Sequence, residues 1–484
     1  MLFNSLHFAI FFICITTAYY FLPHRYRWLL LLIGSCYFYM AFVPIYIFIL
    51  GFTIIVDYIS GIYIEKTKGS TRKIFLISSL LANISILAVF KYYNFFNDSF
   101  NEILKHINYT TPLPPLTILL PIGLSFHTFQ AMSYTIEVYR GNQQAEKHFG
   151  IYALYVMFYP QLVAGPIERP QNILSQFYEK HEFKAKNLSE GLKLITWGLF
   201  KKVVIADRLA IIVNNVYNDP SQFEGLPLIF ATILFAFQIY CDFSGYSDIA
   251  LGTARVMGFR LMKNFDSPYF SRSISEFWKR WHISLSTWFR DYLYIPLGGN
   301  RVTQSRWYFN LFITFLVSGL WHGANWTYVI WGSLNGFYLI LENITKPLRN
   351  RFYGLINFST KSKLSSILGL LSTFFLTCFA WIFFRAKTVQ DALYIVSHLF
   401  SNFSASIKQL KPGALGSTQY DYIVSMMSII ILLSVERIQN EHLCDRWLFQ
   451  QPYLVRMLLY SSLIIFILLF GMFDVQEQFI YFQF

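Results

Sequence analysis

Two histidines lie in segments whose composition suits acid–base chemistry. His322 belongs to the triplet Trp321-His322-Gly323 and lies in a stretch, 307–341, that has no charged residue. A neutral imidazole, with an ordinary pKa of about 6.5, can take a proton from a hydroxyl group near neutral pH. Glycines at 319 and 323 would leave room for a substrate beside the ring. We therefore expect His322 to act as a general base; the competing interpretation is a buried histidine that serves only as a hydrogen-bonding residue.

The second histidine, His282, lies in a segment dense in aromatic and charged residues, 271–292. Ser273 and Glu276 have the spacing of a helix-capping box, which predicts that a helix begins there. The residues that follow at intervals of three or four, and so share one face of that helix, are Trp278, Trp281, Leu285, Trp288 and Tyr292. A helix lying at the membrane surface would show the same pattern, but it would not require His282.

A third polar cluster lies within an apolar run and contains Asp242, Ser244, Tyr246 and Asp248. The two aspartates are six residues apart and therefore do not share a helical face, which argues against a carboxylate pair. No histidine stands at metal-ligand spacing from them, so we expect no metal site. The pattern favours a kinked helix whose polar side chains line a tunnel.

Hydrophobic helices must position these residues. The chain has 484 residues, of which 55% are hydrophobic and 13% are charged. Apolar runs of about 20 residues, long enough to span a bilayer, recur throughout and predict roughly ten to thirteen membrane segments. An ionisable group at membrane depth costs roughly 2.5–3.5 kcal/mol and normally lines a cavity. Such groups concentrate between 120 and 345, so we expect one membrane domain with scaffold helices in 1–115, a catalytic core in 116–345 and further scaffold helices in 346–484.

The basic residues predict the orientation. His24–Arg27 and Glu65–Lys73 are basic loops, whereas the intervening turn at Val43-Pro44 is uncharged. Because cytoplasmic loops carry an excess of Lys and Arg, both basic loops are expected in the cytoplasm and the N-terminus outside. The net charge of +13 suits an anionic cytoplasmic leaflet. The positive residues are scattered between apolar runs, which argues against a nucleic-acid partner.

Several motifs, taken in order, resemble the membrane-bound O-acyltransferase (MBOAT) family, and within it the bacterial alginate O-acetyltransferase type. The related types are peptidoglycan O-acetyltransferases and teichoic acid D-alanyl exporters. The motifs that carry the resemblance are Met1–Ser5, Lys91–Phe95, Gly165–Arg169, Gln238–Asp248, Glu276–Asp291 with Leu297–Arg301, Trp321–Trp326 and Trp381–Ala386. The resemblance spans nearly the whole chain. It implies an all-α ring of tilted transmembrane and re-entrant helices around a central tunnel.

The resemblance also implies an activity and its partners. His322 matches the family's catalytic histidine, and His282 matches its second signature position. Similar proteins take an acyl group, most often acetyl, from a cytoplasmic thioester such as acetyl-CoA and export it to an extracytoplasmic polysaccharide. They hold no permanently bound cofactor, reside in the bacterial inner membrane among its lipids, and often work with a periplasmic SGNH-like acetyltransferase. Direct transfer is favoured over an acyl-enzyme, because no serine or cysteine has an obvious activating neighbour.

Two sets of residues complete the expected site. We expect the substrate tunnel to be lined by Asp242, Ser244, Tyr246, Asp248, Trp288, Arg290, Asp291, Trp321 and Asn325. We expect the donor phosphates to be bound, through charge-assisted hydrogen bonds, by Arg272, Lys279, Arg280 and Arg301. Attraction of an interfacial helix to anionic lipid explains these cations equally well.

Three other functions stay open at this point. D-alanyl transfer from a carrier protein to teichoic acid would use the same fold. A transporter or flippase for a lipid-linked sugar would also be polytopic, but it would be expected to show internal repeats, and the sequence has no recurring pattern of that kind. A scaffold that recruits periplasmic enzymes would not need His322.

Overall fold

The computed structural model describes residues 1–106, 114–117, 121–163, 165–355, 359, 362–411, 413–440, 451–473 and 479–480. Within these residues every regular element is a helix, which confirms the all-α prediction. The described helical segments long and apolar enough to cross a membrane are Pro44–Lys66, Gly69–Lys105, Leu226–Val256, Lys363–Arg385 and Tyr453–Phe470. Leu6–Phe21 is a shorter apolar helix. These segments agree with a multi-pass membrane protein.

The chain folds into two compact units. Unit 1 contains residues 1–195 and 246–262, and unit 2 contains residues 196–245 and 263–484. Two helices, α10 and α12, contribute to both units because a boundary falls inside each of them. The units do not follow the expected boundaries at 115 and 345, and that three-part division stays a prediction.

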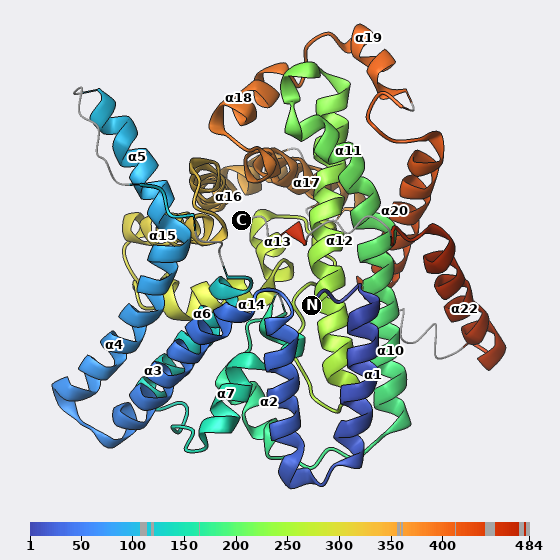
Figure 1. The fold of residues 1–484 in the computed structure, drawn as a ribbon. Helices are drawn as coiled ribbons and strands as arrows, with labels where there is room; N and C mark the ends of the chain where they lie inside the picture. Colours follow the sequence, from blue (N-terminus) through green and yellow to red (C-terminus); the bar gives the residue numbers. More distant parts are fainter. Residues whose placement is uncertain are drawn as a thin grey trace. The chain divides into compact units, whose positions relative to one another are not determined.

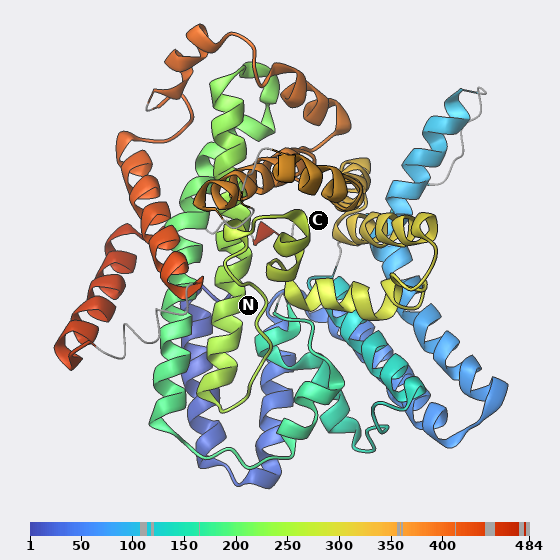
Figure 2. The same cartoon turned by 180° about the vertical axis from the view of Figure 1, so that it is seen from behind.

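Unit 1 is built mainly from the helices of the N-terminal half. Their bounds are α1 Leu6–Phe21, α2 His24–Met40, α3 Ile47–Lys66, α4 Gly69–Leu87, α5 Tyr93–Lys105, α6 Leu124–Arg140, α7 Phe149–Met157, α8 Tyr159–Leu162, α9 Pro170–Ile173 and α10 Ala185–Leu199. Helices α3, α4 and α6 pack against one another (Figure 1). Helices α1 and α2 form an adjacent pair, which Figure 2 shows from behind in faint blue. Pro23 separates these two, since proline is well tolerated at a helix start and cannot continue α1.

Unit 2 contains the residues expected to carry the chemistry. Its helices are α11 Asp207–Asn218, α12 Leu226–Val256, α13 Ile274–Arg280, α14 Ile283–Phe289, α15 Gln304–His322, α16 Trp326–Leu355, α17 Lys363–Arg385, α18 Val389–His398, α19 Phe403–Ser406, α20 Gln419–Asn440 and α22 Tyr453–Phe470. Helices α15 and α16 pack along each other, and α16 also packs on α17 (Figure 1).

Short turns of other helix types interrupt or join these helices. The 3₁₀ turns are η1 Pro44–Tyr46, η3 Ser175–Phe177, η5 Pro220–Gln222, η6 Pro268–Phe270 and η8 Ile407–Leu410. The π-helical turns are η2 Ala88–Tyr92, η4 Phe200–Ala206 and η7 Arg290–Tyr294. Such π turns are often found at functional sites, and both of those in unit 2 carry basic side chains.

One end of unit 1 gathers the basic loops. The segments meeting there are 24–28, 65–72, 138–148, 176–184 and 255–260, which we call the basic end. Glu65 accepts a hydrogen bond from the N–H of Ala145 (3.0 Å), and Arg72 donates to the carbonyl of Val138 (3.0 Å). The Tyr178 hydroxyl donates to Glu146 (2.7 Å), which joins the later loops to the earlier ones. Both loops expected in the cytoplasm therefore lie at the same end of the unit.

This arrangement sharpens the topology prediction. We expect a cysteine placed at Lys68 to be protected from a membrane-impermeant thiol reagent added outside, and one placed at Pro44 to react. The physical reason is the excess of Lys and Arg that holds the basic end in the cytoplasm. The measurement is labelling of single-cysteine variants in a background without the native cysteines, with lysed cells as the control for reactivity. Labelling at 68 with protection at 44 would invert the topology.

Candidate active site

His322 is the last residue of α15, and glycines bring the next helix close to it. A Cβ added at Gly319 would lie 2.3 Å from the carbonyl oxygen of Tyr328, and one added at Gly332 would lie 2.4 Å from that of Phe315. Only glycine permits such an approach of two backbones, so α15 and α16 pack through these positions. In the sequence, Gly319 and Gly323, like Gly332 and Gly336, are four residues apart, the spacing that predicts close helix packing in a membrane, and the structure confirms it. The apolar block 308–343 is too long for one span, which predicts either two helices broken around Ser318-Gly319 or one span and a re-entrant segment. In the structure two helices are present, and the break falls at 323–325.

The imidazole of His322 is buried among aromatic rings. Its ring centre lies 4.9 Å from that of Trp331 with the planes nearly perpendicular, and 5.3 Å from that of Phe384 on α17. The expectation that Gly323 leaves open space for a substrate is wrong, because the ring of Tyr328 fills that space: an added Cβ would lie 2.1 Å from it. A substrate must therefore reach His322 from another direction.

His282 is fully buried and sits in a break between two short helices. The single helix expected from 273 onward is wrong: α13 ends at Arg280 and α14 begins at Ile283, with His282 in the left-handed region at φ 43°. The predicted start is correct, since the Ser273 hydroxyl accepts from the N–H of Glu276 (3.1 Å). The Glu276 carboxylate, however, accepts from the N–H of Arg272 (2.8 Å).

Asn264 provides the physical reason for the break at His282. Its backbone carbonyl accepts from the N–H of Ile283 (2.9 Å). Its side-chain Oδ1 accepts from both the N–H (3.2 Å) and the hydroxyl (2.9 Å) of Ser284. These backbone groups would otherwise continue the hydrogen-bond ladder of α13. A non-glycine residue with positive φ is strained, and such strain persists only where neighbours hold it.

The two histidines come together in unit 2. Their ring centres are 6.5 Å apart, and that of Trp321 lies 6.2 Å from His282 and 5.0 Å from His322. This separation is too long for a direct hydrogen bond between the two rings. A small polar group that hydrogen-bonds to both rings would have to lie between them. One imidazole can then accept a proton while the other donates a hydrogen bond to a developing negative charge.

Tryptophans from three segments form the wall behind these histidines. Trp331 stacks on Trp381 (5.8 Å) and packs edge-on against Trp278 (5.7 Å), and Trp381 contacts Trp281 (5.1 Å). Trp381 and Phe384 belong to α17, a helix that the sequence analysis assigned to the C-terminal scaffold. The Trp381–Ala386 motif was the available signal, but its proximity to His322 depends on tertiary packing.

Asp242 and Ser244 belong to a buried ionic cluster that includes two lysines. Lys202 pairs with both Asp207 and Asp242 (2.7 Å each), and Lys201 donates to the Ser244 hydroxyl (2.9 Å). The other oxygen of Asp242 accepts from the N–H of Ile480 near the end of the chain (2.7 Å). Sequence reasoning missed both lysines, although charged residues inside the apolar run 194–206 were the signal for them.

Comparison with known proteins identifies the family. The model of the MBOAT, membrane-bound O-acyltransferase family matches residues 147–384, which include both histidines. The probable alginate O-acetylase AlgI of Pseudomonas aeruginosa is 37% identical over 446 residues, covering 92% of this chain and 83% of that protein. The chain belongs to the membrane-bound O-acyltransferase family. It is thus an O-acyltransferase and a multi-pass membrane protein.

Two other relatives represent the types named in the sequence analysis. The peptidoglycan O-acetyltransferase of Helicobacter pylori is 34% identical over 449 residues, covering 86% of this chain and 82% of that protein. The teichoic acid D-alanyltransferase of Bacillus subtilis is 28% identical over 289 residues, covering 57% of this chain and 71% of that protein. Similarity to the two O-acetyltransferases is therefore both higher and more extensive.

The remaining expected tunnel residues of this O-acyltransferase belong to both units. Trp288 is buried in unit 2, whereas Tyr246 and Asp248 belong to unit 1, where Tyr246 stacks on Phe3 (4.4 Å). Asn325 accepts from the N–H of Thr327 (3.0 Å) and donates to the carbonyl of Lys387 (3.0 Å), so its amide anchors the start of α16.

One of the expected phosphate-binding cations is paired: Arg280 pairs with Glu276 (2.8 Å). The expected tunnel residues Arg290 and Asp291 pair with each other (2.7 Å). Arg272, Lys279 and Arg301 are exposed. Lys279 and Arg290 line a mainly apolar cavity of about 400 Å³ together with Trp278, Ile283 and Ser318. This cavity thus shares Trp278 with the wall behind His322 and Ile283 with the turn at His282.

Asn264 provides a test of how His282 is held. Asn264→Ala removes the acceptor for two buried donors of Ser284. Each buried donor left without a partner costs about 1–3 kcal/mol. We expect kcat for acyl transfer to fall while the donor KM changes little, because the turn at His282 relaxes. Asn264→Asp keeps an acceptor oxygen and should restore most of kcat.

The control is the same change in a His282→Gly background. There Asn264→Ala should have no further effect on kcat, because the side chain that it positions is gone. If kcat falls equally in both backgrounds, Asn264 supports the fold and does not position His282.

Proposed function

We propose that this O-acyltransferase moves an acetyl group from a cytoplasmic thioester, acetyl-CoA, to a hydroxyl of an extracytoplasmic polysaccharide. The observation that carries this proposal is the meeting of His322 and His282 within one buried aromatic shell. The higher and longer similarity to an alginate O-acetylase and a peptidoglycan O-acetyltransferase supports acetyl as the acyl group.

The chemistry assigns one role to each histidine. His322 accepts the proton of the acceptor hydroxyl as its oxygen attacks the thioester carbon. The new carbon–oxygen bond forms, the carbon–sulfur bond breaks, and coenzyme A leaves as the thiolate, which takes up the proton. His282, too far from His322 to bond it directly, donates a hydrogen bond to the carbonyl oxygen as negative charge develops there.

The cavity beside Trp278 is where we place the donor. Its apolar lining suits the acyl and pantetheine portions of a thioester, and Lys279 and Arg290 can contact phosphates. Arg272, Arg280 and Arg301 lie on the same segment and would add positive potential. The acceptor hydroxyl would meet the donor at the histidines, and a periplasmic SGNH-like acetyltransferase would then pass the acetyl group from that acceptor to the polymer.

The test uses the purified chain reconstituted in lipid vesicles. Acetyl-CoA carrying a labelled acetyl group is supplied on the side of the basic end, with alginate or peptidoglycan fragments and the partner transferase on the other side. We expect thiol release and labelled polymer, both abolished in the His322→Ala variant. Consumption of a D-alanyl carrier thioester with acetyl-CoA untouched would replace this proposal with teichoic acid D-alanylation. Movement of a lipid-linked sugar without thiol release would indicate a flippase.

A further inference from the structure

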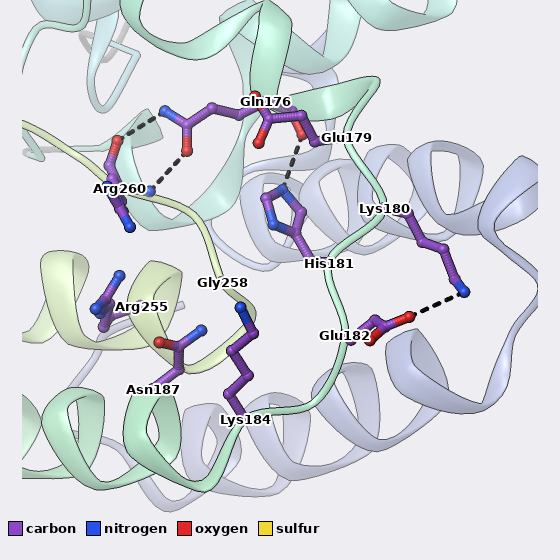
Figure 3. A pocket seen from close by; sticks show the side chains of 10 residues that line it. All are labelled: Gln176, Glu179, Lys180, His181, Glu182, Lys184, Asn187, Arg255, Gly258 and Arg260. Atoms are coloured by element: carbon purple, nitrogen blue, oxygen red, sulfur yellow. Dashed lines mark hydrogen bonds and ion pairs between the residues drawn. The ribbon is translucent and has the colours of Figure 1, made fainter.

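A second cavity, of about 530 Å³, lies at the basic end of unit 1 and has no part in the chemistry described above. Figure 3 shows its lining, which is almost entirely polar. The lining residues come from η3 and the loop after it, the start of α10, and the end of α12 with the segment that follows it: Gln176, Glu179, Lys180, His181, Glu182, Lys184, Asn187, Arg255, Gly258 and Arg260. Four cations therefore face two carboxylates.

The ion pairs of the lining leave positive charge on one side of the cavity. Lys180 pairs with Glu182 (3.1 Å), and Arg255 pairs with Glu190, outside the lining (2.6 Å). Lys184 and Arg260 make no ion pair with any residue that the structure describes. In Figure 3 the side chains of Lys184, Arg255 and Arg260 lie on one side, with Asn187 among them.

The shape of the cavity is held independently of these charges. The Gln176 amide bridges the backbone of Arg260, accepting from its N–H (2.8 Å) and donating to its carbonyl (3.0 Å). His181 bonds the carbonyl of Gln176 (2.9 Å), and burial lowers the pKa of its imidazole, so it contributes a neutral polar ring. A Cβ at Gly258 would lie 3.0 Å from that ring, so the wall is closely packed there.

The start of α10 adds to the positive potential. The helix begins at Ala185, next to Lys184, and its Asn187 lines the cavity. The first N–H groups of a helix favour an anion through their partial positive charge. Tyr178 and Phe183, each next in sequence to residues of the lining, are exposed, and aromatic residues of this kind are enriched at the membrane surface.

We infer that this cavity binds a phosphate group at the cytoplasmic surface, held by Lys184 and Arg260 with the start of α10. Two ligands of the enzyme's surroundings present that chemistry. One is the soluble acyl donor, whose coenzyme A portion carries phosphates; that source rests on the proposed function. The other is the headgroup of an anionic phospholipid in the cytoplasmic leaflet. The polar and mainly cationic lining suits the phosphate itself.

The test measures binding without turnover, on the full chain in phosphatidylcholine nanodiscs doped with phosphatidylglycerol. The variant is Lys184→Gln/Arg260→Gln. The matched control is Lys186→Gln, which removes a charge from the same end of α10 but lies outside the cavity, 3.8 Å from Glu190. Calorimetry reports coenzyme A affinity, and native mass spectrometry reports retained phosphatidylglycerol.

Loss of charge-assisted hydrogen bonds should lower the binding of whichever ligand occupies the cavity, coenzyme A or phosphatidylglycerol, at least about tenfold in the double variant. The control should stay within about twofold, as an exposed charge contributes little. A fall in coenzyme A affinity identifies the donor as the source, and a fall in retained phosphatidylglycerol identifies the lipid. If neither falls, or if the control falls equally, the site is refuted. Because no acetyl transfer is measured, this result is separate from the His322-dependent activity.

Discussion

Replacing His322 with alanine is expected to lower acyl transfer by about 10²–10⁴-fold, the usual contribution of a general base. The imidazole packs against Trp331 and Phe384 at the end of α15. Thiol release from acetyl-CoA and acetyl content of the polymer are the measurements. Size-exclusion profiles in detergent should show that the variant remains folded.

A second substitution at His322 distinguishes loss of the proton-accepting group from loss of side-chain packing. His322→Gln roughly keeps the volume and the hydrogen-bonding groups but cannot accept a proton at neutral pH. We expect it to be as inactive as His322→Ala. His7→Ala, at an exposed histidine of α1, is the control and should transfer acetyl normally. Wild-type transfer by His322→Gln would mean that His322 is a packing residue.

Because His282 has a positive φ, its variants can distinguish a hydrogen-bonding role of the side chain from strain in the backbone. We expect His282→Asn to keep more activity than His282→Ala, since an amide can donate a hydrogen bond and asparagine tolerates positive φ. His282→Gly relaxes the backbone while removing the side chain, so it should be as impaired as alanine. If glycine is active and alanine is not, backbone strain explains the loss, and the hydrogen-bonding role of His282 is wrong.

The second large effect concerns stability. Lys202→Met is expected to destabilise the folded protein by about 3–5 kcal/mol, because it leaves Asp207 and Asp242 as uncompensated buried charges. The measurement is the yield of monodisperse protein and its thermal unfolding in detergent. Lys186→Met, at an exposed position of α10, is the matched control and should behave as the wild type.

A triple variant tests whether unpaired buried charge causes this loss of stability. Adding Asp207→Asn and Asp242→Asn to Lys202→Met removes all three charges and should recover much of the stability, because no ion is then left unpaired. A Lys202→Met protein with unchanged unfolding would show that the cluster does not support the fold. A triple variant as unstable as the single one would show that packing of the lysine stem matters and that its charge does not.

The sequence by itself determined the class of the molecule and much of its candidate site. Long apolar runs leave no soluble alternative. Ser273 caps the helix that begins next to it, and the spacing of glycines along the helices at Gly319 and Gly332 made a close helix pair predictable. The identity of His322 and His282 as candidates depended on residue types in local patterns.

Only the tertiary structure decided how those candidates meet. The helix break at His282 depends on Asn264 from a preceding segment, which competes for the backbone donors of Ile283 and Ser284. The wall behind His322 depends on α17, and the burial of Asp242 depends on Lys202 from another helix. Periodicity along a chain reports which face of a helix is apolar. It carries no information on which distant side chain will satisfy a buried charge or a freed N–H group, because that choice is made by packing.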